Sequence, residues 1–144
     1  MANIQSEEFS YSAGGVEMSG YIAWDSEVEG ERPGVLVVHE WWGNNPYSRS
    51  RARMLAELGY VGMALDMYGN GQNAANPDEA GELMNGLLSD LATVRNRFNA
   101  ALDTLKAHRM VDAENCAAIG YCMGGGIALH MARYGADLKA VGSF

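Results

Sequence analysis

Residues 119–126 read Ile-Gly-Tyr-Cys-Met-Gly-Gly-Gly, and this stretch decides the fold that we expect. A short apolar run, Cys116–Ile119, precedes it, and Gly124–Arg133 follows with the pattern of a helix. Gly-x-Cys-x-Gly between a strand and a helix has the form of a nucleophile elbow in which cysteine replaces serine. Such a turn is so tight that the residues two positions before and after the cysteine must be small.

Strands and helices alternate in the rest of the sequence. Gly34–Val38 is apolar on both faces, which predicts a central strand covered from both sides. Glu8–Ser12 and Val16–Trp24 flank a glycine turn and predict an N-terminal hairpin. The other expected elements are helices that start at Asn45-Pro46, Asn76-Pro77 and Leu91, and strands at Tyr60–Leu65 and Leu138–Phe144. This order predicts an α/β fold, a doubly wound and mostly parallel sheet.

Cys122 is the strongest candidate for a catalytic residue. Its sulfur is expected at the carboxyl end of the sheet and at the start of the following helix, where the helix dipole favours thiolate over thiol. The backbone N–H of Met123 would be placed to donate to a developing oxyanion. The alternative is a buried cysteine in a glycine-rich turn, such as a nucleotide-binding one. The glycine fingerprints of dinucleotide and P-loop sites are missing, so we favour the catalytic interpretation.

A second candidate segment, His39–Gly43, directly follows the buried strand. It reads His-Glu-Trp-Trp-Gly and lacks the second histidine of a zinc-protease helix. Ligands of doubly wound sheets bind beyond the carboxyl ends of the strands, so Glu40 and Trp41 are expected on the same rim as Cys122. Glu40 would place a carboxylate near the thiol, and the Trp41 N–H would be a second oxyanion donor. A capping carboxylate and two packing tryptophans explain the spacing equally well.

The remaining cysteine and histidines are weaker candidates. Cys116 is expected to be a buried core residue too far along the strand to bridge to Cys122. His108 is expected at the end of the long helix, where it would interact favourably with the helix dipole. His130 is expected to lie on a helix face and pack against the sheet. No motif supports a metal site or a bound cofactor.

Three segments resemble the dienelactone hydrolase family of the α/β-hydrolase fold: His39–Gly43, Asp66–Tyr68 and Gly120–Gly125. The resemblance runs through nearly the whole chain. It implies hydrolysis of an ester or lactone through an acyl-cysteine intermediate, with Cys122 as the nucleophile. It further implies that Glu40 interacts with the resting thiol and helps to activate it. The N–H groups of Trp41 and Met123 would form the oxyanion hole.

Two features depart from the family pattern. The family completes its triad with an Asp and a His downstream of the elbow, where this chain has only Asp137 and His130, neither in the family position. We therefore expect residues 1–144 to form one α/β-hydrolase domain that lacks C-terminal strands, roughly a further 100 residues for a domain of about 200–250. The family's carboxylate-binding arginine after Asp66–Tyr68 is replaced by Gly69–Gly71, which implies a less charged ester.

Two other functions stay open. In the first, the chain is a non-catalytic half-domain. It binds a complementing chain, or exchanges segments with a second copy, through the edge of the Leu138–Phe144 strand. Alternatively, Cys122 would serve thiol redox chemistry or acyl transfer.

Composition excludes several classes of partner. Among 144 residues, 18 are acidic and 10 basic, a formal net charge of −8 with no basic cluster, which argues against nucleic-acid binding. Apolar residues make up 48%, enough for a packed core. No apolar run approaches the ~20 residues of a membrane span, and the polar start resembles neither a signal nor a transit peptide. A cytoplasmic location and a small-molecule substrate are therefore expected.

Overall fold

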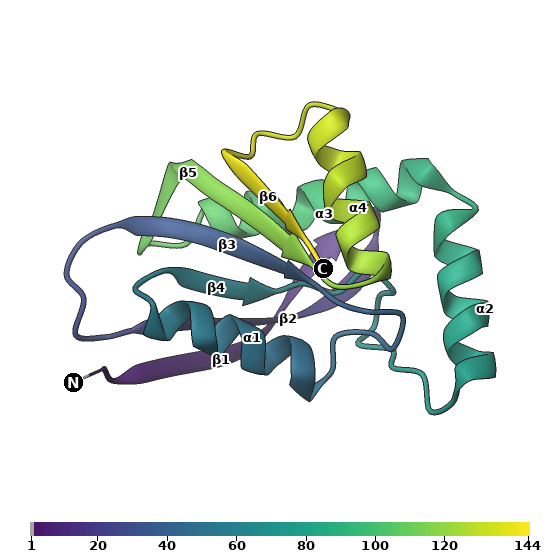
Figure 1. Cartoon of the computed structure of the whole chain (residues 1–144), viewed down its shortest axis with the longest axis horizontal. Helices are drawn as coiled ribbons and strands as arrows, with labels where there is room; N and C mark the ends of the chain where they lie inside the picture. The colour runs from purple at the N-terminus through teal and green to yellow at the C-terminus, as the bar shows by residue number, and fades with distance from the viewer. Residues whose placement is uncertain (1) are drawn as a thin grey trace.

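A computed structural model describes residues 2–144, which form one six-stranded sheet flanked by four helices (Figure 1). The strands are β1 (Ile4–Ala13), β2 (Val16–Asp25), β3 (Arg32–Val38), β4 (Val61–Ala64), β5 (Val111–Gly120) and β6 (Ala140–Ser143). The helices are α1 (Pro46–Glu57), α2 (Pro77–Leu88), α3 (Leu91–Lys106) and α4 (Met123–Arg133). The strand order is β1-β2-β4-β3-β5-β6.

The strand directions confirm the predicted α/β fold. β1 and β2 form an antiparallel hairpin, and β2 also pairs antiparallel with β4. From β4 onward the sheet is parallel, through β3 and β5 to β6. The hairpin turn consists of Gly14 and Gly15, both with positive φ, a conformation that glycine adopts without a steric penalty. The carboxyl ends of the parallel strands therefore share one edge of the sheet.

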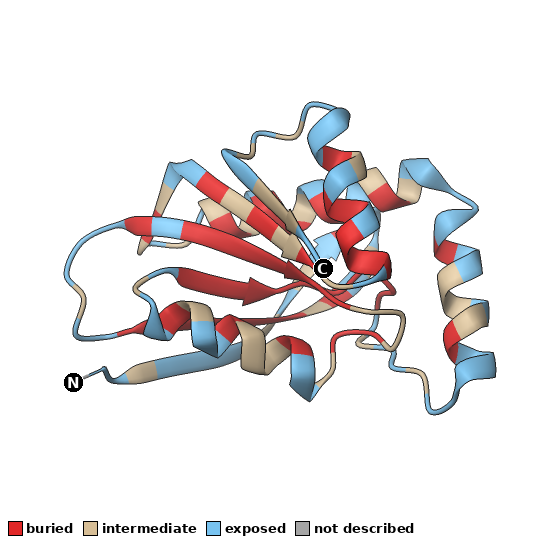
Figure 2. Ribbon diagram, in the orientation of Figure 1, coloured by how far each residue is buried: buried red, intermediate tan, exposed pale blue. Residues whose placement is uncertain are grey.

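The central strands are buried on both faces, as the continuous apolar run in β3 predicts (Figure 2). Leu36 and Val38 point into the larger core, which contains residues of α3 and α4. Val37, between them, points to the opposite face and packs with Ala52 and Ala56 of α1. Alternation along one strand thus builds two hydrophobic layers, one on each side of the sheet.

Side-chain caps begin the first three helices. The Oδ1 atoms of Asn45 and Asn76 accept hydrogen bonds from backbone N–H groups three residues later, at 3.2 and 2.9 Å. Proline follows each of them, at a position where a helix needs no N–H donor. Both predicted helix starts are confirmed. Asp90 caps α3 in the same way, by accepting from the Thr93 N–H at 3.2 Å.

Several strands differ in length from the sequence prediction; β1, predicted at Glu8–Ser12, spans Ile4–Ala13. β5 begins at Val111 rather than at Cys116, because polar residues before Cys116 continue the pairing with β3 across a register shift between Pro33 and Gly34. β6 is shorter than predicted: it spans Ala140–Ser143 and pairs with β5 alone. None of its residues is fully buried. β6 therefore presents an exposed sheet edge.

Among residues 2–144, no helix is both long enough and apolar enough to cross a membrane.

The packing of α1 on β4 leads to a prediction about stability. A Cβ atom on Gly62 would lie 2.3 Å from the Ala52 carbonyl oxygen, so α1 must move away in Gly62→Ala. We expect the free energy of unfolding to fall by about 1–3 kcal/mol, as for other overpacked cores. Urea denaturation measures it. Gly86→Ala is the matched control, because a Cβ there meets nothing within 4 Å. Equal stabilities of the two variants would contradict the prediction.

Candidate active site

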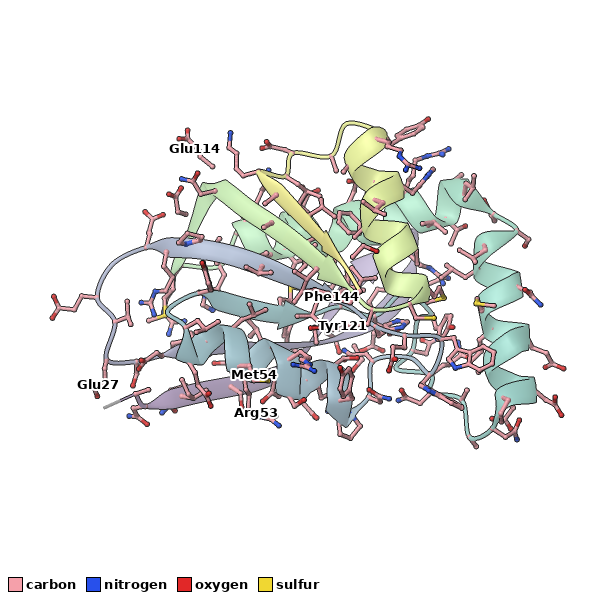
Figure 3. The ribbon with its side chains drawn as sticks, in the orientation of Figure 1. Glu27, Arg53, Met54, Glu114, Tyr121 and Phe144 are labelled. Carbon is pink, nitrogen blue, oxygen red and sulfur yellow. The ribbon has the colours of Figure 1, made fainter. Side chains whose placement is uncertain are left out.

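Cys122 lies in the turn between β5 and α4, at the carboxyl edge of the sheet. Its backbone has φ 54° and ψ −116°, a strained conformation for a residue with a side chain. The residue is exposed, and its thiol is free. Its N–H donates to the Phe144 carbonyl oxygen at 2.7 Å, and Phe144 stacks on Tyr121 at 5.3 Å between ring centroids (Figure 3). The thiol is therefore held on a sharp turn and faces outward.

The two glycines around Cys122 are required by close backbone contacts. A Cβ atom on Gly120 would lie 2.1 Å from the Gly124 carbonyl oxygen, at the start of α4. A Cβ atom on Gly124 would lie 2.2 Å from the Val38 carbonyl oxygen, at the end of β3. The G-x-C-x-G spacing thus has a direct steric cause: it lets α4 begin against the ends of two strands.

The loop after β3 lies beside this turn. Val38 pairs with Gly120 in the parallel register, so Glu40 and Cys122 each follow the paired position by two residues. The Tyr121 N–H donates to the Val38 carbonyl oxygen at 3.2 Å. Glu40 and Trp41 are half-buried, and Met123 is buried. The sheet therefore brings the four residues singled out from the sequence to one rim.

The backbone N–H groups of Met123 and Trp41 are available to a ligand. Met123 is the first residue of α4, so its N–H has no acceptor within the helix. Within residues 2–144, neither this N–H nor that of Trp41 donates to another backbone or side-chain acceptor. An oxyanion site needs unpaired donors of this kind, and these two lie on the rim that carries Cys122.

His39 joins the ends of β3 and β4. Its imidazole is completely buried; Nε2 accepts from the Met67 N–H at 3.0 Å, and Nδ1 lies 2.6 Å from the Glu40 carbonyl oxygen. Because Nε2 is the acceptor, Nδ1 carries the proton and donates it to that oxygen. Burial lowers the pKa of His39, so the ring is neutral. His39 shapes the loop that carries Glu40.

Asp66 organises the loop after β4, a role that the sequence analysis missed. Its buried carboxylate accepts four backbone hydrogen bonds, at 2.9–3.0 Å, from the N–H groups of Ser19, Tyr68, Gly69 and Gly71. An aspartate directly after a buried strand and before a glycine-rich turn was the available signal. The partner on β2 was not visible, because it is 47 residues away in sequence.

Tyr68, held by this loop, contacts both residues proposed from the sequence as oxyanion donors. Its hydroxyl donates to the Trp41 carbonyl oxygen at 2.7 Å and lies 3.5 Å from the Met123 Sδ. Burial raises the pKa of Tyr68 to about 12, so the hydroxyl keeps its proton. Arg97 fixes the tyrosine backbone by donating to the carbonyl oxygens of Met67 and Tyr68. A hydrogen-bonded network thus positions the Trp41 segment.

The other titratable candidates lie outside this site. Cys116 is buried and free, as predicted. His108 directly follows the C-cap of α3, so its predicted position at the end of the long helix is confirmed, and its interaction with the helix dipole stays a prediction. Desolvation by burial lowers the pKa of His108. His130 lies on a helix face, as predicted, and lines a groove between α4 and the α2–α3 segment. Asp137 forms a surface ion pair with Lys106 at 2.6 Å.

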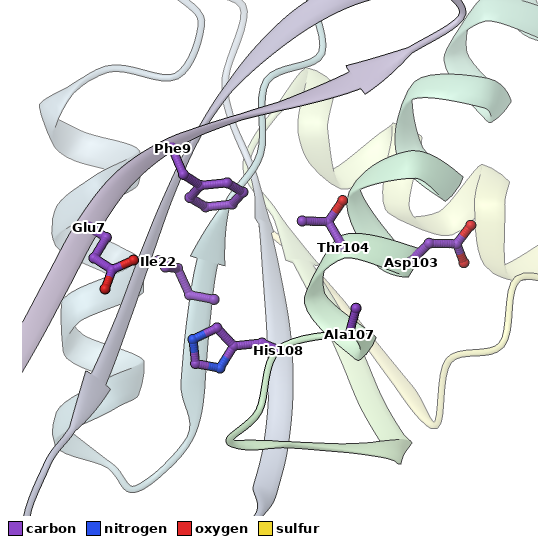
Figure 4. A pocket seen from close by; sticks show the side chains of 7 residues that line it. All are labelled: Glu7, Phe9, Ile22, Asp103, Thr104, Ala107 and His108. Carbon is purple, nitrogen blue, oxygen red and sulfur yellow. The ribbon is translucent and has the colours of Figure 1, made fainter.

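A cavity of about 520 Å³ lies in another part of the fold and is lined by none of these site residues (Figure 4). It lies between the β1–β2 hairpin and the end of α3, where Phe9, Ile22 and His108 converge. His108 precedes β5, so this cavity is at the amino end of the parallel strands, opposite to Cys122. The apolar groove lined by His130, about 320 Å³, includes Met123 and so begins next to the elbow.

No group of three or more His, Cys, Asp or Glu side chains within residues 2–144 is arranged to hold a metal ion.

The buried, neutral His39 makes stability depend on pH. Unfolded His39 takes up a proton near pH 6.5, whereas the folded residue resists protonation. The unfolded state therefore binds more protons, and the free energy of unfolding falls as the pH drops below about 6.5, by up to about 1.4 kcal/mol per pH unit. Urea denaturation from about pH 7.5 to 5 measures the slope.

His39→Gln keeps an acceptor for the Met67 N–H but cannot titrate, so we expect a smaller slope. His108→Gln is the control, since His108 is only partly buried and should contribute less. A slope in His39→Gln equal to that of the wild type would contradict this assignment.

Comparison with known proteins places the chain in a family. "Protein usf" of Aquifex pyrophilus is 35% identical over 135 residues, which cover 89% of this chain and 55% of that protein. The solved structure m3DLH superposes with a TM-score of 0.94 at 42% identity, and covers 98% of this chain and 59% of its own. A dienelactone hydrolase-like promiscuous phosphotriesterase from metagenomic libraries gives 0.94 at 38% identity, with coverage of 100% and 59%.

The chain thus spans about half the length of the curated relatives it matches. The sequence model of the dienelactone hydrolase family matches residues 18–144. That match includes most of β2 and every later element, together with the elbow and the loop after β3. The chain belongs to the dienelactone hydrolase family.

Proposed function

We propose that this protein is the nucleophile-bearing part of a hydrolase that cleaves small esters or lactones through an acyl-cysteine intermediate at Cys122. The observation that carries the proposal is the exposed cysteine on a strained turn at the start of α4, flanked by glycines whose Cβ positions are filled by backbone. Strain of this kind is kept where a side chain must be presented in one direction. The family membership supports the same activity.

The chemistry runs in two steps. Glu40 takes up the thiol proton, and the Cys122 sulfur attacks the carbonyl carbon of the ester. The N–H groups of Met123 and Trp41 donate to the oxyanion as the new S–C bond forms. The C–O bond then breaks, and the leaving alcohol oxygen receives from Glu40 the proton that the thiol gave up. Water attacks the thioester carbon in the second step; the C–S bond breaks, and the acid and the free thiol are released.

Besides Glu40, the proposed second step calls for a group that activates water, and neither triad candidate after Cys122 is placed for it. Asp137 is engaged by Lys106 at the surface, and His130 lies two helical turns along α4 from Cys122. We therefore infer that residues 1–144 carry the acylation apparatus of a larger α/β-hydrolase domain. The coverage of 59% of the related solved chains supports this inference.

A second candidate is a half-domain that is inactive until another segment completes it. The exposed edge of β6 favours this candidate, because its unpaired backbone can accept another strand. Phe144, 73% exposed, lies at the same edge. Size-exclusion chromatography with light scattering distinguishes the two: a stable folded monomer argues against segment exchange, and a concentration-dependent dimer supports it.

Acylation of Cys122 is directly testable. After brief incubation with p-nitrophenyl acetate, we expect one acetyl group on the chain by denaturing intact-mass spectrometry, and none on Cys122→Ala. Cys116→Ala is the matched control: Cys116 is buried, so acetylation should be unchanged. Cys122→Ser should acylate more slowly, because a hydroxyl is a weaker nucleophile without a base. An adduct that persists in Cys122→Ala, or no adduct on the wild type, would overturn the proposal.

A further inference from the structure

The cavity at the amino end of the parallel strands has a mostly apolar lining. Phe9 of β1, Ile22 of β2 and Ala107 at the end of α3 contribute to it, and the His108 ring lies beside them (Figure 4). Its volume of about 520 Å³ falls in the range of small-molecule sites. None of the residues proposed for catalysis lines it. A ligand in this cavity would therefore be separate from an acyl group on Cys122.

Two carboxylates supply the charge of the cavity. Glu7 reaches it from β1 and Asp103 from α3, so the two side chains belong to different walls (Figure 4). The ion pairs found within residues 2–144 use other carboxylates, those of Glu8 and Asp137. Glu7 and Asp103 are thus available to a cationic ligand.

The basic side chains near the cavity are held elsewhere and do not line it. Lys106 forms the ion pair with Asp137. The Arg109 guanidinium lies over the Trp24 ring, 5.7 Å from its centroid. Arg32 is buried and donates to three backbone carbonyl oxygens in the connection between β2 and β3. The negative charge of the cavity is therefore not balanced by its own walls.

The imidazole of His108 adds no positive charge. Its Nδ1 accepts from the Met110 N–H at 3.2 Å, so the proton of the neutral ring is on Nε2. Burial, together with the charge of Arg109, lowers the pKa of His108 and keeps the ring neutral at pH 7. Trp24 packs against this ring with 5.5 Å between the centroids. A cation in the cavity therefore meets two carboxylates and no protonated histidine.

These features fit one class of ligand. We propose that the cavity is a second binding site of the protein, for an organic cation that carries a primary ammonium group on a short alkyl chain. The alkyl chain packs against Phe9 and Ile22, which removes apolar surface from water. The ammonium group has three N–H donors and is attracted by Glu7 and Asp103. The same two side chains repel a ligand that ends in a carboxylate.

Binding of four small molecules to the full chain tests this site. Isothermal titration calorimetry at low salt compares hexylammonium with ethylammonium, hexan-1-ol and hexanoate. We expect hexylammonium to bind at least about tenfold more tightly than ethylammonium, because more CH₂ groups are buried. It should bind about three- to tenfold more tightly than hexan-1-ol, since exposed carboxylates attract a cation only modestly. Hexanoate should bind more weakly than the alcohol.

Salt and chemical shifts identify the cause and the place of binding. Addition of about 0.5 M NaCl should remove the difference between hexylammonium and hexan-1-ol, because salt screens exposed charges. In ¹H–¹⁵N NMR spectra, hexylammonium should shift the signals of Trp24 and His108 and leave those of Cys122 and Met123 unchanged.

Three variants separate the cavity from the overall charge of the protein. Glu7→Gln and Asp103→Asn keep the side-chain shape, and each should weaken hexylammonium binding about two- to threefold without changing hexan-1-ol binding. Glu8→Gln is the matched control. Glu8 is the next residue of β1, points to the opposite face of the sheet and pairs with Arg49, so its loss should leave hexylammonium binding unchanged.

Three results would overturn the proposal. Hexylammonium that binds no more tightly than hexan-1-ol would remove the role of the carboxylates. An equal loss of affinity in Glu7→Gln and Glu8→Gln would attribute the attraction to the net charge of −8. Shifts at Cys122 and Met123 instead of Trp24 would place the ligand at the elbow. None of these results bears on the acetylation of Cys122, so the two proposals stand or fall separately.

Discussion

The close approach of α4 to the end of β3 is the constraint on which the site depends. A Cβ atom on Gly124 would lie 2.2 Å from the Val38 carbonyl oxygen and 2.5 Å from the His39 carbonyl oxygen. Only the hydrogen of a glycine fits between these groups. Because of this contact the chain turns sharply after β5, and Cys122 adopts a positive φ in that turn. The same contact brings the start of α4, with the unpaired Met123 N–H, against the loop that carries Glu40 and Trp41. One backbone contact thus sets Cys122, the turn and the N–H groups that we propose as donors in a single arrangement.

A second layer of buried polar groups holds the loops in that arrangement. His39 links the loop after β3 to the Met67 N–H, and Asp66 gathers four N–H groups around its carboxylate. Tyr68 then closes the connection to the Trp41 carbonyl oxygen. Each of these groups is satisfied by backbone rather than by another side chain, so the loops cannot shift without leaving a buried polar atom unpaired. Rigid support of this kind is what preorganised donors need.

The sequence predicted the parts of this site that depend on local rules. The elbow glycines, the apolar strand before His39 and the proline-marked helix starts all follow from steric and hydrogen-bonding requirements within a few residues. The role of Asp66 could not be predicted, because Ser19 reaches it from a hairpin strand far away in the chain. The surroundings of His108 could not be predicted for a related reason: its place at a helix end follows from local sequence, whereas Trp24 and the hairpin that surround it come from the other end of the chain. Long-range contacts, not propensities, decided these environments.

Helical periodicity places His130 on a face of α4, but it does not predict which elements surround that face. His130 does lie on a helix face that the spacing of apolar residues identifies, but α4 has two such faces. Ile127 and Met131 both reach the main core, while Gly126 and His130 turn toward α2 and α3. Only the path of the α2–α3 connection decides that this second face borders a groove rather than solvent.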